Sequence, residues 1–332
     1  MEIELGLNEK EKETARMIRS QMPHIIIDSH VHCSPKKRGQ ALINEAASIP
    51  GNMFNFFPWG KHRSFFRRVF CDLQYIATTL GFPGKDESNN AYILHLSRTY
   101  KNCIPIFLSS NLPEKGWGRL FAGLKMYPSS RQKSSAESKI SDVFPEGALK
   151  SADRSKRAII LHLPRDIFSH IEELLALAAK YPGISFIIAH MGNIYKDRKD
   201  MGDILGTIKP AKNILFDTAM ITDAQLIGRT IAKLGCGRLL FGSDAPFSYI
   251  RGRYFEAENK IRLQSLIKFS WVNTAEHCDY EKEAKNFKLI HLNIIEAILG
   301  AVKEVFGETS RQRTAKEFIF HANAKNIFQG RD

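Results

Sequence analysis

Short apolar runs and amphipathic stretches alternate along most of the chain. From residue 24 onward, a run of β-branched and other apolar residues is followed by a polar turn and then by apolar residues at helical spacing. Runs that are apolar at successive positions are typical of strands buried on both faces, so this order predicts the βαβ alternation of a parallel sheet. Eight such runs occur, at residues 25–32, 74–81, 104–109, 122–127, 158–162, 184–190, 214–218 and 239–243.

Eight strands that alternate with helices predict an α/β chain folded as a closed (β/α)8 TIM barrel. The 332 residues are expected to form one domain, with an amphipathic helix within residues 1–22 and further helices at 167–180, 292–306 and 315–328. Two insertions interrupt the alternation, at residues 33–73 after the first strand and 249–291 after the eighth. No strand ends in GxGxxG, which disfavours an open dinucleotide-binding sheet.

The composition and the cysteine spacing indicate in which cellular compartment the protein is found. The chain is 43% hydrophobic and 25% charged, as in globular proteins with a full core, and no run approaches the length of a membrane span. Its five cysteines are scattered, odd in number and without CxxC spacing, which argues against a disulfide framework or a cysteine-rich zinc site. These features predict a cytoplasmic protein.

The net charge of +13 raises the question of an anionic partner. Basic side chains interleaved with aromatic ones gather in the first insertion, namely Lys36, Lys37, Arg38, Lys61, Arg63, Arg67 and Arg68. One interpretation is a solvated face with aromatic residues packed beneath it. The other is a lid that holds cations over a pocket for an acidic compound.

The first strand carries the first sign of chemistry, because it ends in His-x-His. Side chains two apart on a strand lie on the same face, so His30 and His32 point the same way. Two imidazoles side by side where a buried strand meets solvent are good metal ligands. The same motif would also occur if a histidine simply packed against a turn.

Four further strands end in an ionisable residue. The fourth, fifth, sixth and eighth runs close with Lys125, His162, His190 and Asp244. Singly, each has an ordinary explanation: a core histidine bonded to a carbonyl, a snorkelling lysine, or an aspartate that caps a helix. Together they would all lie at the carboxyl end of one barrel, where active sites of this fold are built, and buried charges there need partners.

These residues resemble the amidohydrolase superfamily of metal-dependent barrels, in the branch that contains hydrolases and decarboxylases of aromatic and unsaturated acids. The resemblance spans residues 25–328 and is carried by the first-strand HxH, the fifth-strand histidine, Ala-His-Met-Gly and Phe-Gly-Ser-Asp-Ala-Pro. It implies that His30, His32 and Asp244 hold a divalent metal, that His162 completes the site, and that His190 stands next to it as a catalytic residue or a second-metal ligand.

The donor types indicate which metal binds, and the resemblance indicates how many ions bind. Imidazole nitrogens with a carboxylate suit zinc best, with manganese, iron, cobalt or nickel as alternatives. The resemblance favours one ion, with Lys125 as a substrate-binding or supporting residue, or two ions if Lys125 is carbamylated. Arg165, three residues after His162, is a candidate anchor for an acidic group or an ordinary solvent-facing arginine.

The expected activity is hydrolysis of a C–N or C–O bond in a small acidic substrate, by water that the metal activates and whose proton Asp244 accepts. Non-oxidative decarboxylation of an aromatic or unsaturated acid is the alternative on the same ligands. A metal-dependent nuclease is disfavoured, because similar DNases carry a glutamate where this chain has Lys125, and no nucleic-acid-binding motif is present. The expected partners are a small molecule and further copies of the chain in a homo-oligomer, without a membrane.

Overall fold

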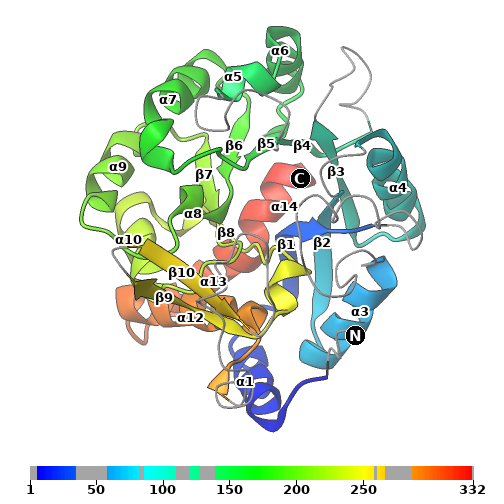
Figure 1. The fold of residues 1–332 in the computed structure, drawn as a ribbon, viewed down its shortest axis with the longest axis vertical. Coiled ribbons are helices and arrows are strands. Elements are labelled where there is room, and N and C mark those ends of the chain that lie inside the picture. Colours follow the sequence, from blue (N-terminus) through cyan, green and yellow to red (C-terminus); the bar gives the residue numbers. More distant parts are fainter. Residues whose placement is uncertain are drawn as a thin grey trace.

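The apolar runs form eight parallel strands, each paired with the next along the chain (Figure 1). The computed structural model describes residues 6–34, 58–81, 86–109, 120–126, 139–257, 260–265 and 286–330. The strands are β1 (Ile25–His32), β2 (Gln74–Leu80), β3 (Cys103–Ser109), β4 (Gly123–Met126), β5 (Ala158–Leu161), β6 (Ser185–Ile188), β7 (Ile214–Asp217) and β8 (Leu239–Leu240).

The segment that follows β8 closes the ring against β1. Ala245 pairs with Val31 in parallel, and its carbonyl oxygen accepts a hydrogen bond of 2.7 Å from the backbone of His32. The backbone of Asp244 donates to the carbonyl oxygen of His30 at 2.9 Å. The predicted (β/α)8 barrel is confirmed, although several strands end one or more residues before the predicted position.

Helices surround the strands. They are α1 (Glu9–Arg19), α3 (Trp59–Val69), α4 (Asp86–Thr99), α5 (Ile140–Val143), α6 (Glu146–Arg154), α7 (Ile171–Lys180), α8 (His190–Asn193), α9 (Met201–Ile208), α10 (Ala224–Leu234), α12 (Ile290–Phe306), α13 (Ser310–Glu317) and α14 (Asn323–Phe328). None of the helices in the described ranges is both long and apolar enough to cross a membrane.

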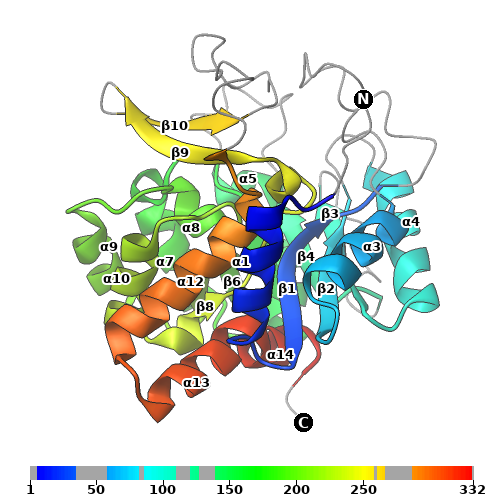
Figure 2. The ribbon, with the colours of Figure 1, turned by 90° about the horizontal axis from the view of Figure 1, so that it is seen from below.

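Two apolar cores follow from the alternation of side chains along the strands. Ile160 belongs to a cluster that includes Phe328 of α14, the helix that lies at the end of the barrel where β1 begins (Figure 2). Its neighbours Ile159 and Leu161 belong to the larger core that strands and outer helices share. The barrel is therefore filled with side chains, and polar groups gather only where the strands end.

The structure describes residues 33, 34 and 58–73 of the first insertion, so Lys36, Lys37 and Arg38 lie outside the described residues. Its helix α3 is amphipathic: Trp59 and Phe65 are buried, whereas Lys61 and Arg67 are exposed. Arg63 lies with its guanidinium 5.1 Å from the centre of the Tyr100 ring. On this helix, a solvated basic face covers buried aromatic side chains.

A buried ion pair joins the N-terminal helix to the second insertion. Glu11 of α1 is fully buried and accepts hydrogen bonds from Arg251 at 2.7 and 2.8 Å and from the backbone of Leu289 at 3.0 Å. Asn8 caps the same helix and forms a capping box with Glu11. The carboxylate of Glu11 therefore holds the base of residues 249–291 against the barrel.

We expect Glu11→Ala to lower the free energy of unfolding by about 3 kcal/mol, because it removes the carboxylate that accepts hydrogen bonds from the Arg251 guanidinium and from a buried backbone N–H group. Urea titration followed by circular dichroism measures the change. Glu9→Ala is the matched control on the same helix, since the pair of Glu9 with Lys12 is exposed to solvent and its loss should leave stability unaltered. Equal stability of the Glu11→Ala and Glu9→Ala variants would contradict this role.

Candidate metal centre

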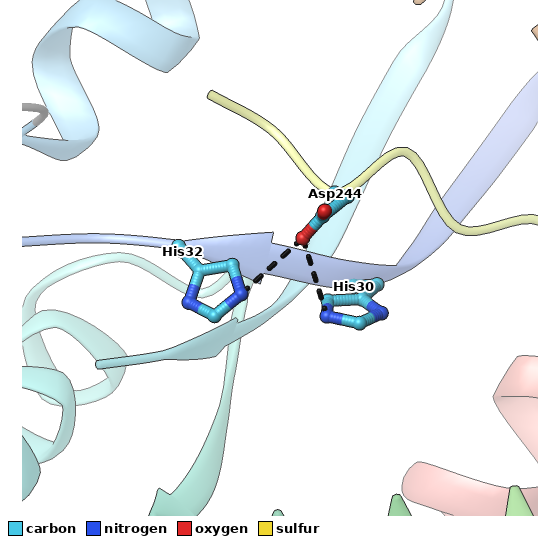
Figure 3. Close-up of side chains that lie close together, drawn as sticks. All are labelled: His30, His32 and Asp244. Carbon is cyan, nitrogen blue, oxygen red and sulfur yellow. Dashed lines mark ion pairs between the residues drawn. The ribbon is translucent and has the colours of Figure 1, made fainter. Parts of the chain in front are cut away.

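Three buried side chains converge at the carboxyl end of the barrel (Figure 3). His30 and His32 come from β1, and Asp244 comes from the segment after β8. One ligand atom from each lies within 4.8 Å of the other two. Oδ1 of Asp244 is 3.4 Å from Nε2 of His30 and 3.3 Å from Nε2 of His32. The prediction that His30 and His32 point the same way from the strand is confirmed.

Hydrogen bonds on the far side of each ring fix which nitrogen carries the hydrogen. Nδ1 of His30 donates to Oδ2 of Asp217 at 2.9 Å, and Nδ1 of His32 donates to the carbonyl oxygen of Gly81 at 3.1 Å. Both Nε2 atoms therefore present lone pairs toward Oδ1 of Asp244. Three lone-pair donors that face one another repel unless a cation lies between them, so the residues present fit a divalent metal.

The backbone around Asp244 is shaped to bring its carboxylate to β1. Asp244 has a left-handed conformation, with φ at 60°, which is uncommon outside glycine and concentrates at functional sites. A Cβ at Gly242 would lie 3.2 Å from Cβ of His30, so this approach is tight for any larger residue. Asp28 fastens the two segments, because its Oδ1 accepts from the backbones of His30 and Ser243 at 3.1 and 2.9 Å.

His162 and His190 form a second imidazole pair beside the first. Nδ1 of His190 donates to the carbonyl oxygen of Ala219 at 3.0 Å, so its Nε2 accepts from Nδ1 of His162 at 3.1 Å. The backbone of His190 donates to Oδ1 of Asp217 at 2.8 Å, and its ring centre is 5.1 Å from that of His30. In this tautomer, Nε2 of His162 also presents a lone pair. The pair thus lies at the same site without belonging to the three-atom group above.

Lys125 of β4 is fully buried next to the same group. Its Nζ donates to Nε2 of His30 at 3.1 Å. Burial lowers the pKa of Lys125, and the nearby carboxylates of Asp217 and Asp244 oppose this, which leaves the pKa at about 8. The ammonium competes with a metal for one lone pair of His30, so Lys125 is placed to influence what this site binds.

Arg165, the other expected substrate-binding residue, lies on the exposed loop after His162. Its carbonyl oxygen accepts a hydrogen bond of 3.0 Å from the side chain of Asn193. This contact ties the loop after β5 to the end of α8. The substrate-binding role of the Arg165 guanidinium stays a prediction.

The protonation states favour cation binding. Burial raises the pKa of Asp244, but the imidazoles of His30, His32 and His190 outweigh it and bring the pKa to about 2. Burial and the Lys125 ammonium lower the pKa of His30 well below its ordinary value. At neutral pH the site therefore contains an ionised carboxylate and a neutral His30 ring, the forms that bind a metal.

Two residues of the site were not among those expected from the sequence. Asp217 ends β7 with an ionisable side chain, so the rule that selected Lys125, His162, His190 and Asp244 applies to it equally. Tyr195 follows α8 and stacks near His190, with ring centres 6.3 Å apart. Burial, and then the carboxylates of Asp244 and Asp217, raise the pKa of Tyr195 above its ordinary value. No periodicity or motif around Tyr195 marked it.

A family model described as amidohydrolase matches residues 121–288, about half of the chain. The chain belongs to the amidohydrolase family. The expected superfamily membership is thereby confirmed, and with it an enzyme of a family that acts on small molecules. A search among curated proteins finds no match.

Solved structures share the fold at low sequence identity. A candidate 2-pyrone-4,6-dicarboxylic acid hydrolase from Pseudomonas putida has a TM-score of 0.57 and 14% identity, over 94% of this chain and 100% of its own. A zinc-bound amidohydrolase from Burkholderia multivorans has a TM-score of 0.57 and 11% identity, over 92% and 99%. A 5-carboxyvanillate decarboxylase from Novosphingobium aromaticivorans, complexed with manganese, has a TM-score of 0.53 and 10% identity, over 92% and 96%.

Proposed function

We propose that this amidohydrolase-family protein is a metal-dependent hydrolase that cleaves a C–N or C–O bond of a small, acidic substrate. The single observation that carries the proposal is the tautomer arrangement. Asp217 and the carbonyl oxygen of Gly81 hold the Nδ1 hydrogens of His30 and His32, so two imidazole lone pairs and Oδ1 of Asp244 face one point. Such an arrangement of donors suits a cation and little else.

His30, His32 and Asp244 would hold the ion, with His162 as the further ligand. Zinc is the first choice for this donor set, with manganese, iron, cobalt or nickel as alternatives. One ion is favoured; a second would require a carbamylated Lys125 together with His162 and His190. Bound there, a divalent cation supplies a Lewis acid that brings the pKa of a water ligand toward neutrality.

The chain's own residues would then handle the proton and the substrate. Asp244, ionised at neutral pH, accepts a proton from the attacking water and returns it to the leaving nitrogen or oxygen. His190 has its Nδ1 hydrogen committed to Ala219, so its Nε2 can only accept. That lone pair accepts the Nδ1 hydrogen of His162, so His190 would act by holding His162 with its Nε2 toward the ion, and it does not polarise a carbonyl. The Lys125 ammonium is the nearby point charge for a substrate carboxylate.

The test compares zinc-loaded, manganese-loaded and chelator-treated protein on acidic lactones, esters and N-acyl amino acids. We expect acid release in a pH-stat, dependent on added metal, without carbon dioxide. Carbon dioxide release from aromatic or unsaturated acids, with no hydrolysis, would replace this proposal by the decarboxylase alternative. Turnover that survives complete removal of metal would overturn both.

A further inference from the structure

His62 of α3 is a fully buried histidine that contacts the main chain of the candidate ligand His32. Its Nε2 lies 3.0 Å from the carbonyl oxygen of His32, and its Nδ1 lies 2.9 Å from the hydroxyl of Tyr249. Burial lowers the pKa of His62 to about 3, so the ring is neutral. A carbonyl oxygen only accepts, so Nε2 of His62 carries the hydrogen and Nδ1 accepts from the Tyr249 hydroxyl.

The hydrogen bond to Tyr249 joins the two insertions of the barrel. Tyr249 ends the short turn η4 (Phe247–Tyr249) and opens the second insertion, which continues into the hairpin of β9 (Gly252–Ala257) and β10 (Lys260–Ser265). Its ring packs on Phe65 of α3, with 4.1 Å between the ring centres. In Figures 1 and 2, α3 lies beside β2, the neighbour of β1. The two insertions therefore meet at this imidazole, at the end of the strand that carries two candidate metal ligands.

The peptide groups of His32 are held from two sides. Its N–H donates to the carbonyl oxygen of Ala245 at 2.7 Å. Beyond Ala245 the chain leaves this ladder, because Pro246 has no N–H to donate and η4 follows it. The His62 imidazole donates to the carbonyl oxygen of His32 at this place. Because the His32 ring is itself bonded to Gly81, these contacts together set the direction of its Nε2.

Aromatic packing alone does not explain an imidazole at this position. The ring of His62 lies 5.9 Å from that of Trp59 and 6.2 Å from that of Phe66. An apolar side chain would fill such a pocket without losing hydration, whereas a buried imidazole needs hydrogen bonds to offset that loss. His291 is a second buried imidazole in this aromatic cluster, and its Nδ1 lies 3.3 Å from Oγ of Ser248. Among the described residues, His291 is not bonded to a candidate metal ligand.

We infer that His62 is a positioning residue that holds the end of β1 so that Nε2 of His32 points at the metal, which makes metal affinity depend on the contact between the two insertions. The inference rests on the proposed function in one respect, namely that His32 binds a metal. Loss of a group that orients a ligand typically weakens metal binding by about 10- to 100-fold. His62 acts through the main chain of His32 and not through its ring, so we expect the lower end of that range.

The test measures the zinc affinity of the full-length protein by competition with a chromophoric chelator, and the visible absorption of the cobalt-loaded protein, which responds to ligand geometry. His62→Leu should bind zinc about 10-fold more weakly and show an altered cobalt band. His62→Gln should restore both readouts toward wild type, because an amide can donate and accept as the imidazole does. His291→Leu is the matched control: it removes a buried imidazole from the same aromatic cluster and should leave both readouts unchanged.

The thermal transition of each variant separates loss of fold from loss of position. If His62→Leu does not fold, Tyr249→Phe takes its place, since it removes only the hydroxyl that orients the His62 ring and should weaken zinc binding by about 3-fold. Wild-type zinc affinity or an unchanged cobalt band in the variant used, or an equal loss in His291→Leu, would overturn the inference. A wild-type protein that binds no zinc would overturn the metal centre as well. Zinc binding without hydrolysis of any substrate would count against the proposed reaction alone.

Discussion

Replacing His30 or His32 with alanine is expected to remove the bound metal. Wild-type protein dialysed against zinc should retain about one ion per chain, the count for a site of this donor type, and each alanine variant should retain almost none. The reason is geometric: either substitution removes one of the two imidazoles of β1 and leaves the other with His162 and Asp244, one donor short of the proposed four-ligand set. Inductively coupled plasma mass spectrometry after gel filtration gives the count.

Two further variants make this measurement specific. Asp217→Asn keeps both imidazoles but replaces the acceptor of the His30 Nδ1 hydrogen with an amide, so the zinc affinity should fall by about 10- to 100-fold and not vanish. His321→Ala removes a histidine that pairs with Glu317 on the C-terminal helices and should change nothing. If the His30→Ala protein retains a full complement of zinc, the ligand assignment is wrong.

The residues that gather at the strand ends could be predicted from the sequence. A period of two predicts that His30 and His32 share a face, and parallel strands predict that Lys125, His162, His190 and Asp244 come to one end of the barrel. The structure brings these six residues into one site. That much depends only on strand direction and side-chain alternation, both of which short stretches of sequence encode.

The orientation of the side chains at the site could not be predicted from the sequence. Whether His30 turns its Nδ1 toward Asp217 depends on a partner 187 residues away, and no local pattern records that contact. His190 and Asp244 both have positive φ, which the preference of ordinary residues for negative φ argues against. The hydrogen bond from His62 to the main chain of β1 likewise requires the fold of the first insertion, which the sequence presents only as a basic segment with aromatic residues.

Asp244→Asn is expected to abolish turnover while leaving the fold intact. Asparagine matches aspartate in size and can still ligate through its amide oxygen, but it cannot accept the proton of the attacking water. Loss of a general base typically costs about 10²- to 10⁴-fold in kcat, with KM altered far less. The kcat of the zinc-loaded variant, measured on the substrate that the panel identifies, tests this expectation.

The matched control is Asp223→Asn, the same chemical change at a site that only caps a helix. The side chain of Asp223 accepts from the backbone of Leu226 at the start of α10, and asparagine caps as well as aspartate. Activity of this variant should equal that of the wild type. Because the pKa of Asp244 is lowered to about 2, its carboxylate is ionised throughout the neutral range, so no loss of rate from its protonation is expected between pH 5 and 8. An Asp244→Asn enzyme that turns over within a few fold of wild type would remove this carboxylate from the proton transfer and leave it a ligand alone.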